Sequence, residues 1–157
     1  MQIPGILKND FVISTDKTKI DLNVVHDYLS KESYWAKNIP LAVLVRAIEN
    51  SFCFGIYKKQ ATVDIQVGFA RVITDKATFG YLADVFVLPA YRGIGISKWL
   101  MIEIMNHPEL SGFRGWMLGT KDAHGLYERF GFKRLQNSER IMRLALLDSY
   151  PEKDVTD

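Results

Sequence analysis

Apolar residues recur at two different spacings along this chain, and the spacing changes several times. In residues 22–29 and again in residues 41–48 they lie three and four positions apart, which predicts two amphipathic helices. Asp21 is a predicted N-cap for the first helix, and Pro40 suits the first turn of the second. We therefore expect the first third of the chain to contribute a helical pair, joined by a loop with two large aromatic residues.

The middle of the chain has the composition of extended strands. Residues 52–57, 61–73 and 81–88 are rich in β-branched and aromatic side chains and are separated by short polar turns. A shorter run of the same kind stands at residues 11–14, ahead of the helical pair. Short connections favour antiparallel pairing, so the three central strands are predicted to form a meander.

Helical and extended spacing alternate again after the central strands. A helix is predicted over residues 96–107 and a strand over residues 113–118. A further helix follows Asp122, and two last strands are predicted at residues 132–135 and 140–147. The pattern as a whole predicts a mixed α and β fold.

A chain of 157 residues is long enough for one domain with a substantial core, and no linker or internal repeat divides it. We therefore expect a single domain over residues 1–157, with a frayed polar tail over residues 148–157. The hydrophobic share of 48% and the charged share of 24% are those of an ordinary globular protein.

Charge and cysteine content argue against several classes of function. The net charge of +2 is small and the basic residues are scattered, so we expect no nucleic-acid partner. No run approaches the ~18 apolar residues of a membrane helix, and the first residues lack the pattern of a signal peptide. The lone Cys53, between two phenylalanines, is predicted to be a buried structural residue rather than a nucleophile. The expected location is cytoplasmic, and no group of His, Cys and acidic residues has metal-ligand spacing.

The stretch from residue 81 to residue 100 carries the strongest chemical signal. An apolar strand containing Asp84 is followed by Gly93 and Gly95, and helical spacing then begins at Ile96. A glycine loop that opens a helix presents unpaired backbone N–H groups at the positive end of the helix dipole. This arrangement predicts an anion site, typically for phosphate.

Three interpretations of the glycine loop are possible from its pattern. A dinucleotide-binding loop would need a third glycine, but Lys98 stands at that position. A P-loop would need a Gly-Lys-Ser/Thr ending, which is absent, so ATP or GTP hydrolysis is disfavoured. A loop with a purely structural role stays open on this evidence alone.

Two motifs together resemble a known family. The sequence Arg92-Gly93-Ile94-Gly95-Ile96-Ser97 resembles motif A of the GNAT superfamily of acyl-CoA N-acyltransferases. The sequence Ala123-His124-Gly125-Leu126-Tyr127-Glu128-Arg129-Phe130-Gly131-Phe132 resembles its motif B. The resemblance implies an α/β fold of the α+β type. In this fold a mostly antiparallel mixed sheet of about six to seven strands is flanked by about four helices.

The resemblance also implies acetyl-CoA as the co-substrate, with no metal. Backbone N–H groups of the glycine loop would hold the pyrophosphate, and a strand edge splayed from its neighbour would hold the pantetheine amides. An N–H in that gap could also polarise the thioester carbonyl. The implied binding residues are Val85, Phe86, Val87, Arg92, Gly93, Ile94, Gly95, Ile96 and Ser97. This sequence departs from the family's pattern at two positions. Ser97 stands in place of glycine or alanine, and Thr120 stands where many members carry asparagine.

The family's mechanism assigns two catalytic roles to residues of this chain. Tyr127 corresponds to the tyrosine that protonates the departing thiolate, although its helical spacing also allows a place in the core. Many members use a glutamate as base, but Ala83 occupies that position here. Asp84 is then the best remaining base or water-orienting group, the alternative being a structural acid. Of the three histidines, only His124 lies beside the start of the motif B helix.

Substrate residues are less well defined by the sequence. Tyr34 and Trp35 lie where family members often form the acceptor site, and they could stack on an aromatic or cationic amine or anchor the core. Arg71 could meet a substrate carboxylate or an acid such as Asp84. We expect an acetyl-CoA-dependent N-acetyltransferase that acts on a small amine or amino-acid-like acceptor. A homodimer is a possible assembly of this enzyme. The alternatives are a protein lysine or N-terminal acetyltransferase and a catalytically weak acyl-CoA sensor.

Overall fold

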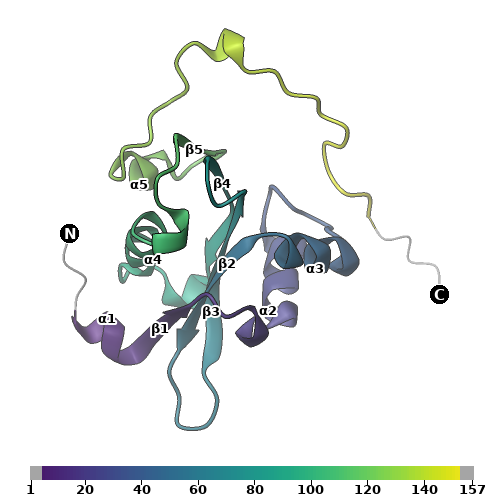
Figure 1. Cartoon of the computed structure of the whole chain (residues 1–157). Helices are drawn as coiled ribbons and strands as arrows, with labels where there is room; N and C mark the ends of the chain where they lie inside the picture. The colour runs from purple at the N-terminus through teal and green to yellow at the C-terminus, as the bar shows by residue number, and fades with distance from the viewer. Residues whose placement is uncertain (1–4, 153–157) are drawn as a thin grey trace.

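The computed structural model describes residues 5–152, and its backbone forms one mixed sheet with helices on both faces (Figure 1). The strands are β1 (Phe11–Ser14), β2 (Phe52–Lys58), β3 (Ile65–Thr74), β4 (Phe79–Val87) and β5 (Gly115–Leu118). They lie in sequence order across the sheet, antiparallel from β1 to β4, whereas β5 runs parallel to β4. A parallel neighbour needs a long crossover, and a helix supplies it here.

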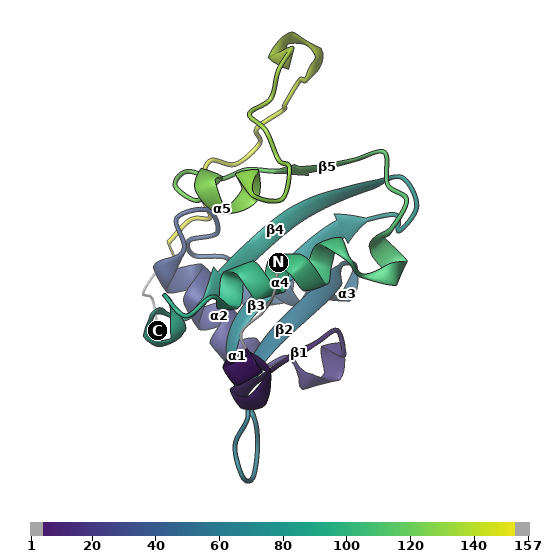
Figure 2. The same ribbon diagram turned by 90° about the vertical axis from the view of Figure 1, so that its left-hand side faces the viewer.

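The helices divide into two layers that sandwich the sheet. They are α1 (Gly5–Asp10), α2 (Leu22–Asp27), α3 (Leu41–Glu49), α4 (Ile96–Met105) and α5 (His124–Glu128). Helix α4 and the buried side of α5 belong to one apolar cluster, and α2 and α3 belong to a second. Figures 1 and 2 show α4 on one face of the strands and the α2–α3 pair on the other.

The predicted helical faces form the cores of both layers. Trp99, Leu100 and Ile104 of α4 are buried, as are Leu44 and Ile48 of α3. These spacings place one side of each helix against the sheet, which removes its apolar side chains from water. The amphipathic patterns in the sequence are therefore confirmed for both helices.

Helix α2 begins at the predicted cap and ends in an unusual turn. One carboxylate oxygen of Asp21 accepts hydrogen bonds from the backbone N–H groups of Asn23 and Val24. The helix continues as a π-helical turn over Tyr28–Glu32. Such turns are often found at functional sites, and this one brings Tyr28 onto β4, where its ring stacks on that of Phe86 at 4.0 Å.

Among residues 5–152 the sheet has five strands, so the expected count of six to seven is wrong. Neither residues 132–135 nor residues 140–147 form a strand among the described residues, although both have strand-like composition. A strand exists only where a neighbour accepts its backbone hydrogen bonds, and none is recorded there. The long strand predicted from residue 61 begins at Ile65, because residues 61–64 belong to the turn after β2.

The expected tail has an anchor within the described residues. Tyr150 packs against the α2–α3 cluster, and its carbonyl accepts a hydrogen bond from the Asn38 side chain at 3.4 Å. Residues 153–157, the rest of that expected tail, lie outside the described residues.

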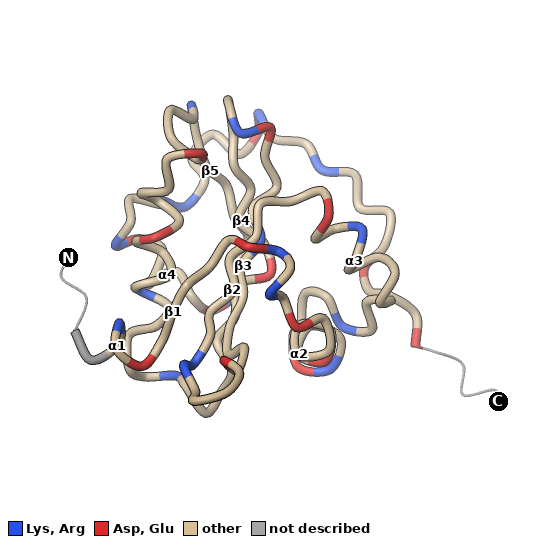
Figure 3. The backbone as a smooth tube through the Cα atoms, turned by 60° about the horizontal axis from the view of Figure 1, so that its bottom comes forward, with Lys and Arg blue, Asp and Glu red and all other residues tan. Residues whose placement is uncertain are grey.

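Charges of both signs are interspersed over the described backbone (Figure 3). Within residues 5–152, no helix is both long enough and apolar enough to cross a bilayer. The sheet opens between β4 and β5, beyond the paired residues Leu82 and Leu118.

Candidate active site

The sheet splits between β4 and β5. Their pairing ends at the partners Leu82 and Leu118, whereas β4 continues to Val87. The edge of β4 from Ala83 onward has no strand beside it on the β5 side, so backbone donors and acceptors there are free for another partner. Val85, Phe86 and Val87, the strand residues implied by the family resemblance, all lie in this unpaired part.

A β-bulge lies at the point where the strands separate. Phe69 pairs with Phe86 and Arg71 pairs with Ala83, so two residues of β4, Asp84 and Val85, oppose one residue of β3. Asp84 has a left-handed backbone with φ of 54°. Aspartate tolerates this conformation better than most residues, and the bulge turns its side chain toward the α2–α3 side of the sheet. Bulges of this kind re-aim a side chain next to active sites.

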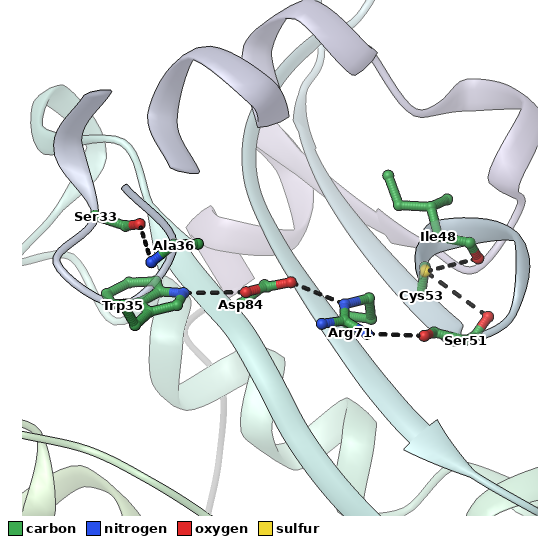
Figure 4. Close-up of polar contacts among 8 residues, drawn as sticks. All are labelled: Ser33, Trp35, Ala36, Ile48, Ser51, Cys53, Arg71 and Asp84. Carbon is green, nitrogen blue, oxygen red and sulfur yellow. Dashed lines mark hydrogen bonds and ion pairs between the residues drawn. The ribbon is translucent and has the colours of Figure 1, made fainter. Parts of the chain in front are cut away.

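The Asp84 carboxylate joins three segments of the chain (Figure 4). One oxygen accepts a hydrogen bond from Arg71 Nε at 2.8 Å, and the other accepts one from Trp35 Nε1 at 3.0 Å. Arg71 Nη1 also donates to the Ser51 hydroxyl at 3.1 Å. Asp84 is buried, and the ion pair is largely shielded from water. Of the two partners considered for Arg71, the structure therefore records Asp84.

The glycine loop follows β4 and ends at α4. Gly93 and Gly95 have φ of 80° and 95°, a region that favours glycine. A Cβ on Gly93 would meet nothing within 4 Å, so the loop is open on that side. Gly95 caps α4 without a side-chain hydrogen bond, which leaves first-turn N–H groups free. In this loop Ile94 is exposed and Ile96 is buried, while Ser97 lies in the first turn of α4.

Arg92 is held at the entrance of that loop. Its Nε donates to the carbonyl of Val87 at 2.8 Å, and its Nη2 donates to the hydroxyl of Tyr28 at 2.8 Å. Because Tyr28 also stacks on Phe86, the π-helical turn, the end of β4 and the loop form one connected unit. Two of the five guanidinium donors are used in this way, and an arginine with donors to spare can still bind an anion.

Tyr127 lies on α5 at the other side of the split. Its side chain is 8% exposed and packs in the α4–α5 cluster, which is the core position that its helical spacing allows. It also lines the cavity described below. Burial raises the pKa of Tyr127 to about 12, with smaller contributions from Tyr34 and Asp122. The phenol therefore keeps its proton at neutral pH and can act as a hydrogen-bond donor.

A cavity of about 850 Å³ occupies the space between the split strands and the loop after α2. Its walls contain the ends of β4 and β5, the loop of residues 34–36, and residues 141–144 from the C-terminal segment. It brings together Tyr34, Trp35, Arg71, Asp84, Val85 and Tyr127, all of them named from the sequence. Residues 92–97 of the glycine loop are not among its walls.

Several site residues had no sequence signal or a different expected role. The Thr120 hydroxyl accepts a hydrogen bond from the Ala123 N–H at 3.1 Å, at the start of α5. The Tyr34 hydroxyl accepts one from the Lys121 N–H at 2.8 Å, which ties the loop of residues 34–36 to the segment after β5. Tyr28 was not predicted as a site residue from the sequence, because its contacts with β4 depend on the π-helical turn.

The Cys53 thiol lies in the core and does not line the cavity. Cys53 is buried in β2, as predicted, and burial raises its pKa to about 11. A thiol protonated at neutral pH is a poor nucleophile. Within residues 5–152, no group of three or more His, Cys, Asp or Glu residues is placed to hold a metal ion.

Comparison with known proteins identifies the class to which this fold and site belong. A family model described as acetyltransferase (GNAT) domain matches residues 49–134. A curated protein of Gibberella zeae named as an acetyltransferase is 32% identical, with 80% of this chain and 81% of that protein covered. These matches show that the chain belongs to the GNAT acetyltransferase family.

Solved structures agree with the fold. A GNAT-family acetyltransferase from Xanthomonas campestris is 46% identical, has a TM-score of 0.81, and covers 92% of this chain and 96% of its own. An acetyltransferase from Clostridium acetobutylicum, solved with acetyl-CoA, has a TM-score of 0.64 over 87% of this chain and 96% of its own. Its identity is 15%, so that likeness concerns the fold alone.

Proposed function

We propose that this protein is an acetyl-CoA-dependent N-acetyltransferase that transfers an acetyl group to the amine of a small molecule. The observation that carries the proposal is the split between β4 and β5. It leaves a free strand edge that leads from the cavity at Asp84 to the glycine loop at Gly93. A long ligand with amide groups and a terminal diphosphate matches that succession of strand edge and helix N-terminus.

The residues present suit a coenzyme A ester. The open space beside Gly93 allows a diphosphate close to the backbone, and the uncapped first turn of α4 offers N–H donors. Arg92 adds positive charge at the loop. When bound, acetyl-CoA would supply an activated thioester carbonyl, and the free edge of Val85 to Val87 would hold the coenzyme by main-chain hydrogen bonds. In this arrangement the Ser97 side chain needs only to be small enough for the diphosphate to approach the loop.

Tyr127 is proposed to donate a hydrogen bond to the departing sulfur. Its phenol keeps its proton, since burial raises its pKa to about 12. That pKa lies above the roughly 8.5 of a thiol, so a complete proton transfer is uphill, whereas stabilisation of negative charge by a fixed donor is not. The residue lines the same cavity as Asp84.

The acceptor is proposed to bind in the cavity beside Trp35. A volume of about 850 Å³ is within the range of small-molecule sites. The rings of Tyr34 and Trp35 meet edge to face at 5.0 Å and present aromatic faces to a cationic amine. Each Asp84 oxygen takes one donor and retains a lone pair. Asp84 can therefore attract the ammonium group or orient a water that removes its proton.

The test compares two tyrosine variants. The purified protein is incubated with acetyl-CoA and a panel of small amines, and free CoA thiol is measured. We expect Tyr127→Phe to lower kcat by about 10²-fold or more, the usual contribution of a general acid. Tyr57→Phe is the matched control, because Tyr57 is also buried with a raised pKa but does not line the cavity.

Three outcomes would overturn parts of the proposal. Equal kcat in Tyr127→Phe and the wild type would remove the acid role from Tyr127. Saturable acetyl-CoA binding without transfer to any amine would favour the second candidate, an acyl-CoA sensor. The engagement of both Asp84 oxygens by Arg71 and Trp35 is the observation that supports that candidate. Transfer only to peptides would move the acceptor class to protein amines.

A further inference from the structure

Tyr28 connects three parts of the site that lie far apart in the sequence. Its hydroxyl accepts a hydrogen bond from Arg92 Nη2 at 2.8 Å. Its ring stacks on that of Phe86, with centroids 4.0 Å apart and planes 15° apart. The same ring lies 6.5 Å from that of Trp35, which forms part of the cavity wall. Tyr28 therefore joins the entrance of the glycine loop, the free edge of β4 and the cavity.

The place of Tyr28 depends on the π-helical turn after α2. The N–H of Ser33 donates to the Tyr28 carbonyl at 3.0 Å, a bond that spans five residues instead of the four of an α-helix. The buried Ser33 hydroxyl donates to the Leu29 carbonyl at 2.6 Å and accepts a hydrogen bond from the Ala36 N–H at 3.1 Å. These bonds define the turn, and with it the place of the Tyr28 ring on β4.

The guanidinium of Arg92 is held by two partners and keeps donors for a third. Nε donates to the Val87 carbonyl at 2.8 Å, and Nη2 donates to Tyr28. Both hydrogens of Nη1 and one of Nη2 have no recorded partner in the described chain, and they form the outer fork of the group. Arg92 is exposed, so a single contact through Nε would leave this long side chain with much of its rotational freedom. The Tyr28 hydroxyl supplies the second contact that fixes its plane.

The positive charge of Arg92 is not neutralised by the protein around it. Within residues 5–152, no carboxylate lies within ion-pair distance of this side chain. Both of its acceptors are neutral oxygens, a backbone carbonyl and a phenol. The next residue, Gly93, has open space where a side chain would be. An arginine that is oriented but unpaired beside an open loop suits an anionic ligand better than a purely structural role.

We propose that Tyr28 is a positioning residue for the coenzyme, whose hydroxyl holds the Arg92 guanidinium in the orientation that binds the diphosphate. This inference rests on the proposed function, since it takes a coenzyme A ester as the ligand. Tyr28 is not among the residues that line the cavity. Its hydroxyl should therefore contribute to affinity only where the ligand carries a diphosphate.

The test measures binding of CoA to the full chain by titration calorimetry. Tyr28→Phe keeps the ring that stacks on Phe86 and removes only the hydroxyl. We expect the Kd for CoA to rise about tenfold, because Arg92 loses a hydrogen bond that orients its charge. Tyr91→Phe is the matched control, since Tyr91 adjoins Arg92 but its hydroxyl has no hydrogen bond recorded within residues 5–152. Its Kd should stay within about twofold of the wild type.

Two comparisons distinguish positioning of Arg92 from a general structural effect. Pantetheine, which ends before the diphosphate, is measured by competition with CoA and should bind equally to the wild type and Tyr28→Phe. In the Arg92→Ala background, Tyr28→Phe should cause no further loss of CoA affinity, because the group that the hydroxyl orients is gone.

The outcomes separate this inference from the proposed function. Equal CoA affinity in the wild type and Tyr28→Phe, equal weakening of CoA and pantetheine, or additive losses in the double variant would each overturn the positioning role. All three would leave the proposed acetyl transfer standing. A wild type that binds no CoA would overturn the coenzyme of the proposed function, and the role of Tyr28 with it.

Discussion

The ion pair between Arg71 and Asp84 yields the sharpest prediction about stability. Asp84→Asn removes the charge but keeps the shape, the hydrogen-bond acceptor for Trp35 and the tolerance for a left-handed backbone. The substitution therefore isolates one effect, since it leaves the Arg71 guanidinium in place without its anion.

The size of the effect follows from the burial of the pair. The side chains of Arg71 and Asp84 are 15% and 6% exposed, and their ion pair is 2.8 Å long. Removing one member of a buried pair costs about 3–5 kcal/mol, because the other charge stays desolvated without compensation. The remaining exposure of Arg71 places the expected loss near the low end, at about 3 kcal/mol. In the double variant with Arg71→Met, much of that loss should be recovered.

The assay is urea unfolding of the wild type, both single variants and the double variant at one fixed protein concentration. The coupling energy from this cycle is expected to be about 2–3 kcal/mol. The exposed pair of Lys76 and Glu109, with side chains 52% and 55% exposed, is the control and should give no more than about 1 kcal/mol. A coupling below about 0.5 kcal/mol for Arg71 and Asp84 would refute the reasoning.

Four further substitutions test packing, capping and titration. Tyr57→Phe should raise the free energy of unfolding by about 1 kcal/mol in urea melts, since it removes a buried hydroxyl that has no hydrogen-bond partner; a loss would contradict this. Gly68→Ala should lower the thermal midpoint, because a Cβ would lie 2.9 Å from the Phe86 carbonyl. Asp21→Ala should cost about 1 kcal/mol in the same melts through loss of the α2 cap. Cys53→Ala tests a pH effect, because burial raises the pKa of the folded thiol to about 11 from its ordinary value of 9.0. The unfolded chain therefore releases its proton first, so wild-type stability should fall as the pH rises from about 9 to 11, and the variant should lack that part of the slope.

Local spacing in the sequence was sufficient for most elements of the fold. The three-to-four-residue pattern of α3 and α4 and the cap at Asp21 are local properties, so a chain read in isolation already contains them. The burial of Cys53 in β2 follows from apolar neighbours in the same way. These predictions succeeded because the interactions concerned lie within a few residues of one another.

The environment of Asp84 depended on the tertiary structure. The bulge arises because β4 contributes one residue more than β3 at that point, which is a property of the register between two strands. The partners Arg71 and Trp35 lie 13 and 49 positions away in the chain. An acidic residue within an apolar strand marked Asp84 as a candidate site residue. The side chains that donate hydrogen bonds to its carboxylate, however, come from other segments of the chain.

The sequence by itself determined which segments are helical or extended, which faces are apolar, and the two motifs that resemble the GNAT family. Only the tertiary structure decided the partners. Residues 115–118 and 140–147 both have strand composition, yet the first lies beside β4 and the second lies beside no strand in the described chain. The reason is physical: a helix satisfies its hydrogen bonds within itself, whereas a strand needs a neighbour that its own sequence does not specify.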